Sequence, residues 1–361
     1  MKHSFAVLRL VCAARLIVLV SLMLALAGCL NTAGTNPGAA PKPSAPSAPN
    51  QGDPGAAGKD SGTAPSTSGG GTAEEPKPFR FVVMGDSRGN AKGTNEAVLR
   101  NLMQKVKGLS PVPSFILFTG DMVTGGTNLD SQLETWKDLV DDYFPMTSVY
   151  PALGNHEHNE KMFSDVFPNL PKESLTGYGK TVYSFDYGNA RFITLNSDRQ
   201  NKDNRYVIDE NQRNWLEQQL KSSGDKHVFV QFHMPAYPVG AHLGSSLDGD
   251  PASRDALWAL LDRYRVTAVF VGHEHNYNRR LVDSSFDGNG YHFGHAIYQL
   301  TLGGAGAPLY SESQDSKQVV AGPKASYHYM IVDVAGKRAT FKAYDLQQNE
   351  IDSFTVERSD L

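Results

Sequence analysis

The clearest pattern in the chain is a set of short apolar runs that each end at polar residues. The runs cover 79–84, 115–118, 149–153, 227–232 and 267–271. The polar blocks that follow them are Gly85-Asp86, Gly120-Asp121, Gly154-Asn155-His156-Glu157, His233 and Gly272-His273-Glu274-His275. A nearly continuous apolar run of this length is typical of a strand buried on both faces. Ligand sites gather beyond the carboxyl ends of such strands in open α/β sheets, so we expect the polar blocks to lie together.

Apolar residues at helical spacing lie between several of these runs. They predict helices over 94–106, 211–220 and 253–264. In the first predicted helix, the spaced positions are Ala97, Val98, Asn101, Leu102 and Lys105. In the other two they are Trp215, Leu216, Leu220, Ala256, Leu257, Leu260 and Leu261. Ser253 and Asp255 are typical of a helix start, so we expect the third helix to begin there.

Further strands are predicted outside these runs. Segments 181–186 and 191–195, separated by Tyr187-Gly188-Asn189, predict a hairpin. The C-terminal end predicts strands at 327–334, 339–344 and 351–356. Together the elements predict an α/β fold in which helices lie outside two mixed β-sheets.

The start of the chain has the pattern of an export signal. Basic residues precede an apolar run over 16–27, which is too short to cross a bilayer and is typical of a secretory segment. The run ends in Leu26-Ala27-Gly28-Cys29, which resembles the lipobox of bacterial lipoproteins. This resemblance implies that residues 1–28 are removed and that Cys29 carries a lipid. The alternative is an ordinary signal peptide in which Cys29 has no special role.

The next segment has the composition of a tether. Residues 31–78 are mainly Pro, Gly, Ala, Ser and Thr, so they bury too little surface to offset the entropy of ordering, and we expect them to be disordered. We therefore expect a signal peptide over 1–28, a lipidated tether over 29–78 and a folded domain over 79–361. Leu30, by the same lipoprotein resemblance, favours the outer membrane or cell surface over the inner membrane. The other cysteine, Cys12, lies in the signal segment, so we expect no disulfide.

The charge of the chain limits its partners. The formal net charge is −4, and removal of the basic signal segment makes it more negative. An acidic surface argues against a nucleic-acid-binding protein. It does not argue against anionic substrates, because bound divalent cations dominate their local field.

The polar blocks contain the donor atoms of a two-metal site. They supply two aspartates, one asparagine and three histidines, namely Asp86, Asp121, Asn155, His233, His273 and His275. Oxygen and imidazole donors without a thiolate suit iron, zinc or manganese. Two adjacent cations stabilise both the attacking and the leaving oxygen of a phosphate ester. The blocks therefore predict a hydrolase for phosphate esters.

From Phe79 to about Val356, the chain resembles the calcineurin-like metallophosphoesterases and, among them, the purple acid phosphatases. The resemblance rests on the order of the polar blocks, with additional similarity in 183–189, His233-Met234-Pro235-Ala236-Tyr237 and His275-Asn276-Tyr277-Asn278-Arg279. It implies a four-layer αββα sandwich.

The resemblance also implies a role for each site residue. Asp121 would bridge two metal ions. Asp86 and His275 would complete the protein ligands of the first metal, and Asn155, His233 and His273 those of the second. A metal-activated water would attack phosphorus, and His156 would protonate the leaving oxygen. The alternative for His156 is a residue that only orients its neighbours.

Arg88 departs from the family pattern. Many members have a ligating histidine at this position, and purple acid phosphatases have a ligating tyrosine where this chain has Thr124. A guanidinium has no free lone pair, so Arg88 cannot ligate, and we expect the first metal site to lack one protein ligand. One hypothesis is that Arg88 binds the substrate phosphate as a bidentate clamp. The alternative is a salt bridge with Asp121 or Glu157.

The leading interpretation is a lipid-anchored, extracytoplasmic phosphomonoesterase whose partners are a small phosphate ester and a membrane. One alternative is a phosphodiesterase for cyclic nucleotides or glycerophosphodiesters. Another is a catalytically inactive lipoprotein that binds metal or ligand. Of the remaining histidines, His242 is expected at the border of the substrate pocket, and His158 is expected to face solvent.

Overall fold

The computed structural model describes residues 76–89 and 93–358 of the chain. The chain divides into two units, Met1–Gly69 and Gly70–Leu361, and every described residue belongs to the second unit. The predicted signal peptide, Cys29 and nearly all of the predicted tether therefore lie outside the described residues. Within the described part, none of the helices combines the length and the apolar composition that a bilayer span requires.

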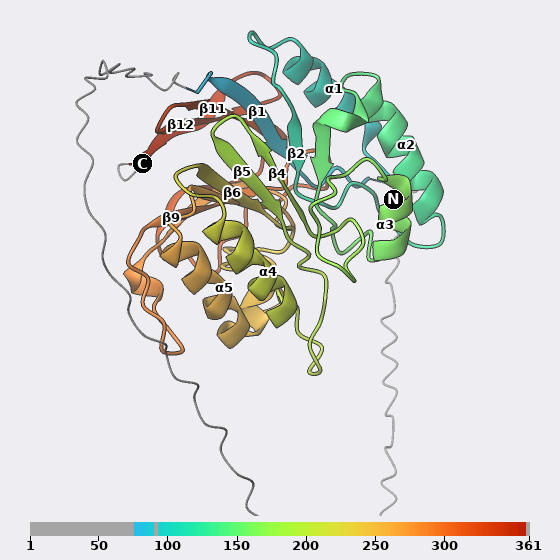
Figure 1. Cartoon of the computed structure of the whole chain (residues 1–361). Helices are drawn as coiled ribbons and strands as arrows, with labels where there is room; N and C mark the ends of the chain where they lie inside the picture. Colours follow the sequence, from blue (N-terminus) through green and yellow to red (C-terminus); the bar gives the residue numbers. More distant parts are fainter. Residues whose placement is uncertain (1–75, 90–92, 359–361) are drawn as a thin grey trace, which may run out of the picture. The chain divides into compact units, whose positions relative to one another are not determined.

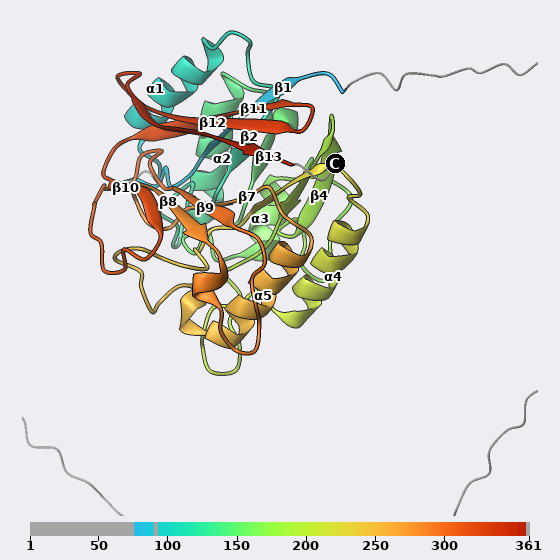
Figure 2. The ribbon, with the colours of Figure 1, turned by 90° about the vertical axis from the view of Figure 1, so that its left-hand side faces the viewer.

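The first sheet of the described part has six strands in the order β13-β12-β11-β1-β2-β3 (Figures 1 and 2). Its strands are β1 (Phe79–Met84), β2 (Ile116–Phe118), β3 (Val149–Pro151), β11 (His328–Ala335), β12 (Arg338–Asp345) and β13 (Glu350–Glu357). Strands β1, β2 and β3 are parallel neighbours, whereas β11, β12 and β13 extend the sheet in antiparallel pairs. Three strands that precede predicted ligands therefore end at the same edge of this sheet.

The second sheet has seven strands in the order β10-β8-β9-β7-β6-β5-β4 among the described residues. Its strands are β4 (Tyr183–Tyr187), β5 (Ala190–Thr194), β6 (His227–Gln231), β7 (Ala268–Val271), β8 (Tyr277–Val282), β9 (Ile297–Leu302) and β10 (Val319–Lys324). Strands β5, β6, β7 and β9 run parallel. The predicted hairpin is β4 paired with β5, with Tyr187 opposite Ala190.

Helices cover the outer face of each sheet, which gives the layer order helix, sheet, sheet, helix (Figure 1). On the first sheet lie α1 (Glu96–Lys107), α2 (Leu129–Asp141) and α3 (Glu160–Val166), and on the second lie α4 (Glu210–Lys221) and α5 (Pro251–Arg263). Short 3-10 turns occur at η1 (Met146–Ser148), η2 (Leu247–Gly249) and η3 (Ser284–Phe286). The predicted α/β fold with two mixed sheets between helices is confirmed.

The alternation of side chains along β1 explains this layering, because successive residues of a strand point to opposite faces. Val82 and Met84 pack with the helices of the first sheet. Phe81 and Val83 face the second sheet and belong to the apolar core between the sheets. The Phe81 ring lies 5.3 Å from the ring of Phe115 and 5.2 Å from that of Phe229, which is on β6 of the second sheet. Aromatic packing therefore contributes to the core between the two sheets.

The structure corrects the predicted face of α1. The spaced positions Ala97 and Asn101 are exposed, and the buried face is instead made of Leu99, Leu102, Met103 and Val106. Leu102 was a predicted position and is buried, and Val98 packs against the core, but spacing alone also selected the polar residues Asn101 and Lys105 and missed Leu99, Met103 and Val106. Burial of a stripe requires apolar side chains along its whole length.

The start of α5 also differs from the prediction. Asp250 is the N-cap, its carboxylate accepts a hydrogen bond from the Ser253 N–H at 3.0 Å, and Pro251 takes the first helical position. Proline suits that position because its missing N–H would have no partner there. Asp255 lies inside the helix, where it is buried and accepts a hydrogen bond from the Tyr237 hydroxyl at 3.1 Å. Helices α2 and α3 were not predicted.

Candidate metal centre

The ends of strands from both sheets meet at the polar blocks. In the first sheet, the Asp86 N–H donates to the Gly120 carbonyl at 2.9 Å. In the second sheet, the Gly272 N–H donates to the His233 carbonyl at 2.9 Å. The His273 N–H donates to the Asp86 carboxylate at 2.9 Å, which links the two sheets. The expectation that separate strand ends bring these residues together therefore matches the geometry.

Glycine precedes several of the polar residues because the turns approach one another closely. A Cβ atom on Gly154 would lie 2.3 Å from a carboxylate oxygen of Asp121. A Cβ atom on Gly272 would lie 2.3 Å from a carboxylate oxygen of Asp86. Both distances are far inside van der Waals contact, so any side chain at either position would push a carboxylate out of place.

Three of the predicted ligands have a backbone conformation that non-glycine residues seldom adopt. The φ angles are 61° at Asp86, 50° at Asp121 and 70° at His273. Such residues cost on the order of 1–3 kcal/mol each and cluster at functional sites. The turns after β1, β2 and β7 are therefore shaped to direct these side chains inward at a cost to stability.

One group of donor atoms surrounds the Nε2 atom of His233. It comprises Asp121, His233 and His273, whose ligand atoms all lie within 4.8 Å of one another. The distances from His233 Nε2 are 3.0 Å to Asn155 Oδ1, 3.2 Å to His273 Nδ1 and 3.3 Å to Asp121 Oδ1. These are the residues expected at the second metal.

The other group, which is the one expected at the first metal, comprises Asp86, Asp121 and His275, again with all ligand atoms within 4.8 Å of one another. His275 Nε2 lies 3.7 Å from Asp86 Oδ1. Asp121 belongs to both groups, and its two oxygens make it suitable to bridge two cations. The group at the first metal has fewer protein donors than the group at the second metal, where the Asn155 oxygen is added, and neither Arg88 nor Thr124 replaces the missing ligand.

Two of the three predicted histidine ligands, His233 and His275, have rings oriented as metal ligands require. His233 Nδ1 lies 2.8 Å from the Thr119 carbonyl, and His275 Nδ1 lies 2.9 Å from the Pro308 carbonyl. A carbonyl only accepts, so each Nδ1 carries a proton, and each Nε2 is directed at the carboxylates. Ligating histidines in proteins usually donate their other ring N–H in this way. The donor types, their spacing and their orientation fit two cations.

Burial and mutual charge set the protonation of these groups. Burial favours the neutral form of Asp121, but the charge of His233 and its hydrogen bond outweigh burial and lower the pKa of Asp121. Burial lowers the pKa of His233, yet the charge of Asp121 raises it on balance to about 10. Burial lowers the pKa of His275 to about 4 and that of His273 well below its ordinary value. His273 and His275 therefore offer neutral lone pairs, and a cation would replace the proton between Asp121 and His233.

Glu157 joins the two turns that carry Asp121 and Asn155. It is buried, and its carboxylate accepts from the N–H groups of Asp121 at 3.0 Å, Val123 at 3.1 Å and Gly154 at 2.8 Å. Burial raises the pKa of Glu157 to about 8. We did not predict this supporting role, although the position of Glu157 two residues after Asn155 was a signal for it. Glu274, between His273 and His275, supports the Val239 and Gly240 N–H groups in the same manner at 3.0 Å and 2.6 Å.

His156 and Arg88 lie where the centre opens to solvent. Their side chains are 29% and 24% exposed, whereas that of Asp121 is 2% exposed. His156 Nδ1 lies 2.8 Å from the Thr124 carbonyl, and its Nε2 lies 3.9 Å from Asp121 Oδ2. Arg88 Nε lies 3.7 Å from the same oxygen. Arg88 therefore forms the ion pair with Asp121 that was the alternative to a phosphate clamp, whereas Glu157 accepts from backbone N–H groups instead.

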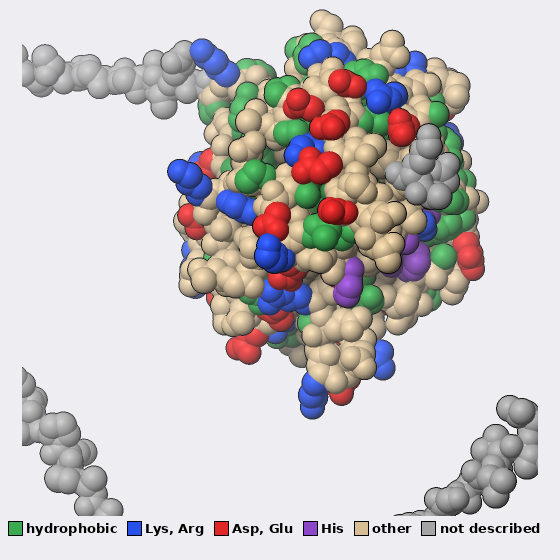
Figure 3. Space-filling model, turned by 90° about the vertical axis from the view of Figure 1, so that its right-hand side faces the viewer, with side chains coloured by type: hydrophobic (Ala, Val, Ile, Leu, Met, Phe, Trp, Pro, Cys, Tyr) green, Lys and Arg blue, Asp and Glu red, His purple; other side chains and the backbone are tan. Residues whose placement is uncertain are grey.

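Other histidines lie at or near the centre. The His242 ring lies 3.8 Å from the His273 ring, so His242 packs directly against a predicted ligand. The His158 side chain is 71% exposed, but its Nδ1 lies 2.6 Å from the carboxylate of Asp198. Figure 3 shows a face of the molecule on which histidine side chains reach the surface.

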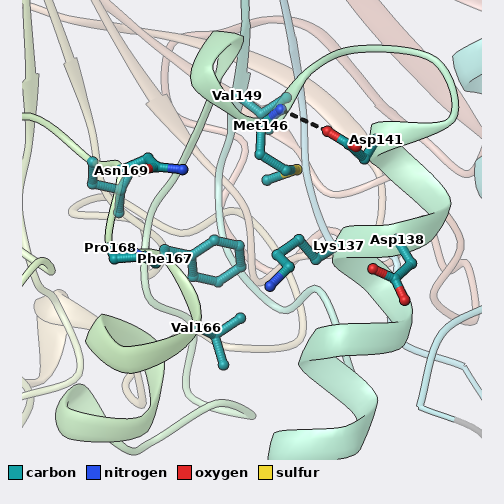
Figure 4. Close-up of a pocket in the computed structure, with 10 residues that line it drawn as sticks. Lys137, Asp138, Asp141, Met146, Val149, Val166, Phe167, Pro168 and Asn169 are labelled. Atoms are coloured by element: carbon teal, nitrogen blue, oxygen red, sulfur yellow. Dashed lines mark hydrogen bonds between the residues drawn. The ribbon is translucent and has the colours of Figure 1, made fainter.

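Two hollows in the described part are relevant to the site. A groove of about 690 Å³ borders it, because its lining includes Gly89, next to Arg88, and Pro308, the partner of His275. A second pocket of about 250 Å³ lies between α2 and the segment after α3 (Figure 4). Lys137, Asp141 and Phe167 line this second pocket, and it contains none of the predicted ligands. The lining of the groove also contains none of the predicted ligands, so the strand ends define the candidate site and the groove only borders it.

The role of Glu157 gives a prediction for metal binding. Glu157→Gln replaces one acceptor oxygen with an NH₂ group that cannot accept from the backbone, so the Asp121 and Asn155 turns should loosen while all six ligands remain. We expect metal affinity to fall by about 10–100-fold. Isothermal titration with Mn²⁺ or Zn²⁺ measures this, with Asp121→Ala as the variant that loses binding and Glu134→Gln, on the exposed side of α2, as the control. Unchanged affinity in Glu157→Gln would contradict the supporting role.

Comparisons with known proteins place this site in a family. The family model for calcineurin-like phosphoesterases matches residues 79–277. The chain is 29% identical over 187 residues to a probable glycerophosphodiester phosphodiesterase, GpdQ, of Arcobacter nitrofigilis, covering 51% of this chain and 64% of that protein. It is 24% identical over 268 residues to probable inactive purple acid phosphatase 27 of Arabidopsis thaliana, covering 65% of this chain and 42% of that protein.

A solved structure shows the same fold. Purple acid phosphatase PPD1 from yellow lupin (Lupinus luteus) has a TM-score of 0.55 at 17% identity, covering 78% of this chain and 54% of that chain. The chain spans less than two thirds of the length of either curated relative. The family model, in contrast, matches more than half of this chain, and it includes all of the polar blocks described above. The chain belongs to the calcineurin-like phosphoesterase family.

Proposed function

We propose that this protein is a metal-dependent phosphoester hydrolase with a two-cation centre that acts on phosphomonoesters. The observation that carries the proposal is the position of Asp121, which lies in both groups of potential ligands. Two cations held there would supply Lewis acidity and an activated water, and iron, zinc and manganese all suit the donor set. The groove beside the centre offers room for the organic part of an ester.

Residues of the chain itself would donate the proton, balance the charge and hold the geometry of the centre. His156 keeps its Nδ1 proton on the Thr124 carbonyl, which leaves Nε2 directed at the open side of Asp121. Its partial exposure allows proton exchange with solvent. An imidazole can donate a proton to a leaving oxygen near neutral pH. Asp86 and Asp121 balance part of the positive charge of the centre, and the fixed rings of His233 and His275 keep its geometry.

Two other functions compete with this proposal. The likeness to a protein named a probable glycerophosphodiester phosphodiesterase favours diester substrates. The likeness to a protein named probable inactive purple acid phosphatase 27 favours a fold that binds without turnover. The ester and binding measurements below separate all three.

We also propose that the protein is exported and anchored to a bacterial membrane through a lipid on Cys29. The support is the sequence alone, namely the apolar run over 16–27 that ends in Leu26-Ala27-Gly28-Cys29. The low-complexity tether would separate the phosphoesterase domain from the membrane surface. The site would then act on esters outside the cytoplasm.

The first prediction concerns the substrate. Protein loaded with Mn²⁺, Zn²⁺ or Fe should hydrolyse p-nitrophenyl phosphate with a higher kcat/KM than bis-p-nitrophenyl phosphate, because the proposed substrate is a monoester. Initial-rate assays measure both, with Asp121→Ala as the inactive control. A higher kcat/KM for the diester would favour the phosphodiesterase, and metal binding without turnover of either ester would favour the inactive protein.

A second prediction concerns His156. His156→Gln removes the proton donor but no predicted ligand, so kcat should fall by about 10²–10⁴-fold while metal content stays the same. Elemental analysis and steady-state kinetics measure the two quantities. His158→Gln is the matched control, since it changes a histidine of the same turn that lies outside both ligand groups. Loss of metal in His156→Gln would show that the assigned division of roles is wrong.

A third prediction concerns the anchor. Cys29→Ala removes the sulfur that would carry the lipid, so the full chain expressed in a bacterium should move from the membrane fraction to the soluble exported fraction. Labelling with an alkyne fatty acid should mark the wild-type chain and not the variant. Equal labelling of both chains would argue against acylation at Cys29.

A further inference from the structure

We propose that Arg88 binds the substrate phosphate and selects monoesters over diesters. The inference deepens the proposed function, because it assigns the substrate class to one residue of the same site. It starts from the position of the guanidinium. Arg88 Nε and His156 Nε2 lie 3.7 Å and 3.9 Å from the same oxygen, Asp121 Oδ2. The two side chains therefore both approach the same oxygen of the shared carboxylate, and both are partly exposed.

Hydrogen bonds hold the backbone of Arg88, but none of the described residues forms a hydrogen bond with its Nε. The Arg88 N–H donates to the Asp121 carbonyl at 3.0 Å, and Arg88 forms an isolated β-bridge with Thr94. In contrast, Arg88 Nε is buried and has no hydrogen-bond partner among the described residues. Its 3.7 Å distance to Asp121 is too long for a hydrogen bond. The second expected carboxylate, Glu157, is already occupied by three backbone N–H groups. Arg88 therefore makes an ion pair with Asp121 but no hydrogen bond through Nε, so its guanidinium can still donate to a ligand.

A guanidinium at this place suits a phosphate oxygen. Arginine stays protonated and directs parallel N–H groups at two oxygens of one phosphate. The Arg88 side chain is only 24% exposed, so an ion pair between Arg88 and a phosphate would be partly shielded from water. Hydrogen bonds to charged groups under such conditions are stronger than those between neutral groups.

The preference for monoesters over diesters follows from the number of non-bridging oxygens on the phosphate. A monoester has three non-bridging oxygens and, near neutral pH, two negative charges. If two of these oxygens face the cation centre, the third remains for Arg88. A diester has only two non-bridging oxygens and one negative charge. Its remaining position is an esterified oxygen, which carries an organic group and offers a guanidinium neither charge nor space. Arg88 would therefore strengthen monoester binding and contribute little to diester binding.

Binding of two simple anions to metal-loaded protein tests this. The variants are Arg88→Gln, which removes the charge, and Arg88→Lys, which keeps the charge but loses the two-pronged donor. Arg100→Gln is the matched control, because Arg100 is an exposed arginine that pairs with Glu96 and Asp142 on the surface. Isothermal titration gives the dissociation constants of inorganic phosphate and of dimethyl phosphate, and elemental analysis gives the metal content.

We expect Arg88→Gln to weaken the binding of inorganic phosphate by about 10–100-fold and that of dimethyl phosphate by about twofold or less, at unchanged metal content. Arg88→Lys should recover part of the loss. The ratio of kcat/KM for p-nitrophenyl phosphate to that for the bis ester should fall in parallel. Equal weakening of both anions would overturn the selection, and loss of metal in both Arg88 variants would show that Arg88 supports Asp121 instead. Wild-type protein that binds phosphate but hydrolyses no ester would disprove the proposed function and leave the binding test intact.

Discussion

The position of the Asp121 carboxylate is the constraint on which the rest of the site depends. Its backbone has a φ of 50°, and its N–H is held by Glu157 at 3.0 Å. Its Oδ1 accepts from the His156 N–H at 3.0 Å and lies 3.3 Å from His233 Nε2, while its Oδ2 faces Arg88 and His156. One carboxylate therefore touches both ligand groups and the mouth of the site. Any shift of this side chain would disturb both groups at once.

Such a concentration of buried charge is unfavourable unless something balances it. Asp86 and Asp121 are almost completely inaccessible and lie in one cluster with three imidazoles. Buried ionised groups need partners, and breaking a buried pair leaves a charge that costs several kcal/mol. In this cluster the proton of His233 offsets part of the charge of Asp121. Bound cations would offset more of it, so metal binding and the stability of the strand ends are coupled through the same carboxylates.

The sequence predicted those parts of the molecule that are determined by residues close together in the chain. An apolar run that ends at a ligand is a local pattern: β1, β2 and β7 end at the predicted residues, while β6 and β3 end one and two residues earlier than predicted. The two sheets followed from the same runs. The face of α1 and the start of α5 depend on tertiary packing and on one cap, Asp250, so spacing alone did not give them. The support by Glu157 also depends on tertiary contact, because it joins segments more than thirty residues apart, Asp121 to Glu157.

The unequal composition of the two ligand groups has a consequence for binding. The second group contains His233, His273 and the nearby Asn155 oxygen, whereas the first contains Asp86 and His275 beside the shared Asp121. Arg88 adds a positive charge near the weaker group, which disfavours a cation there while the mouth is empty. A phosphate dianion between them would remove that repulsion and contribute an oxygen donor. Linkage is reciprocal, so an anion that tightens the first cation is itself bound more tightly when that cation is present. An arginine in place of a ligand would thus make full assembly of the centre depend on the substrate.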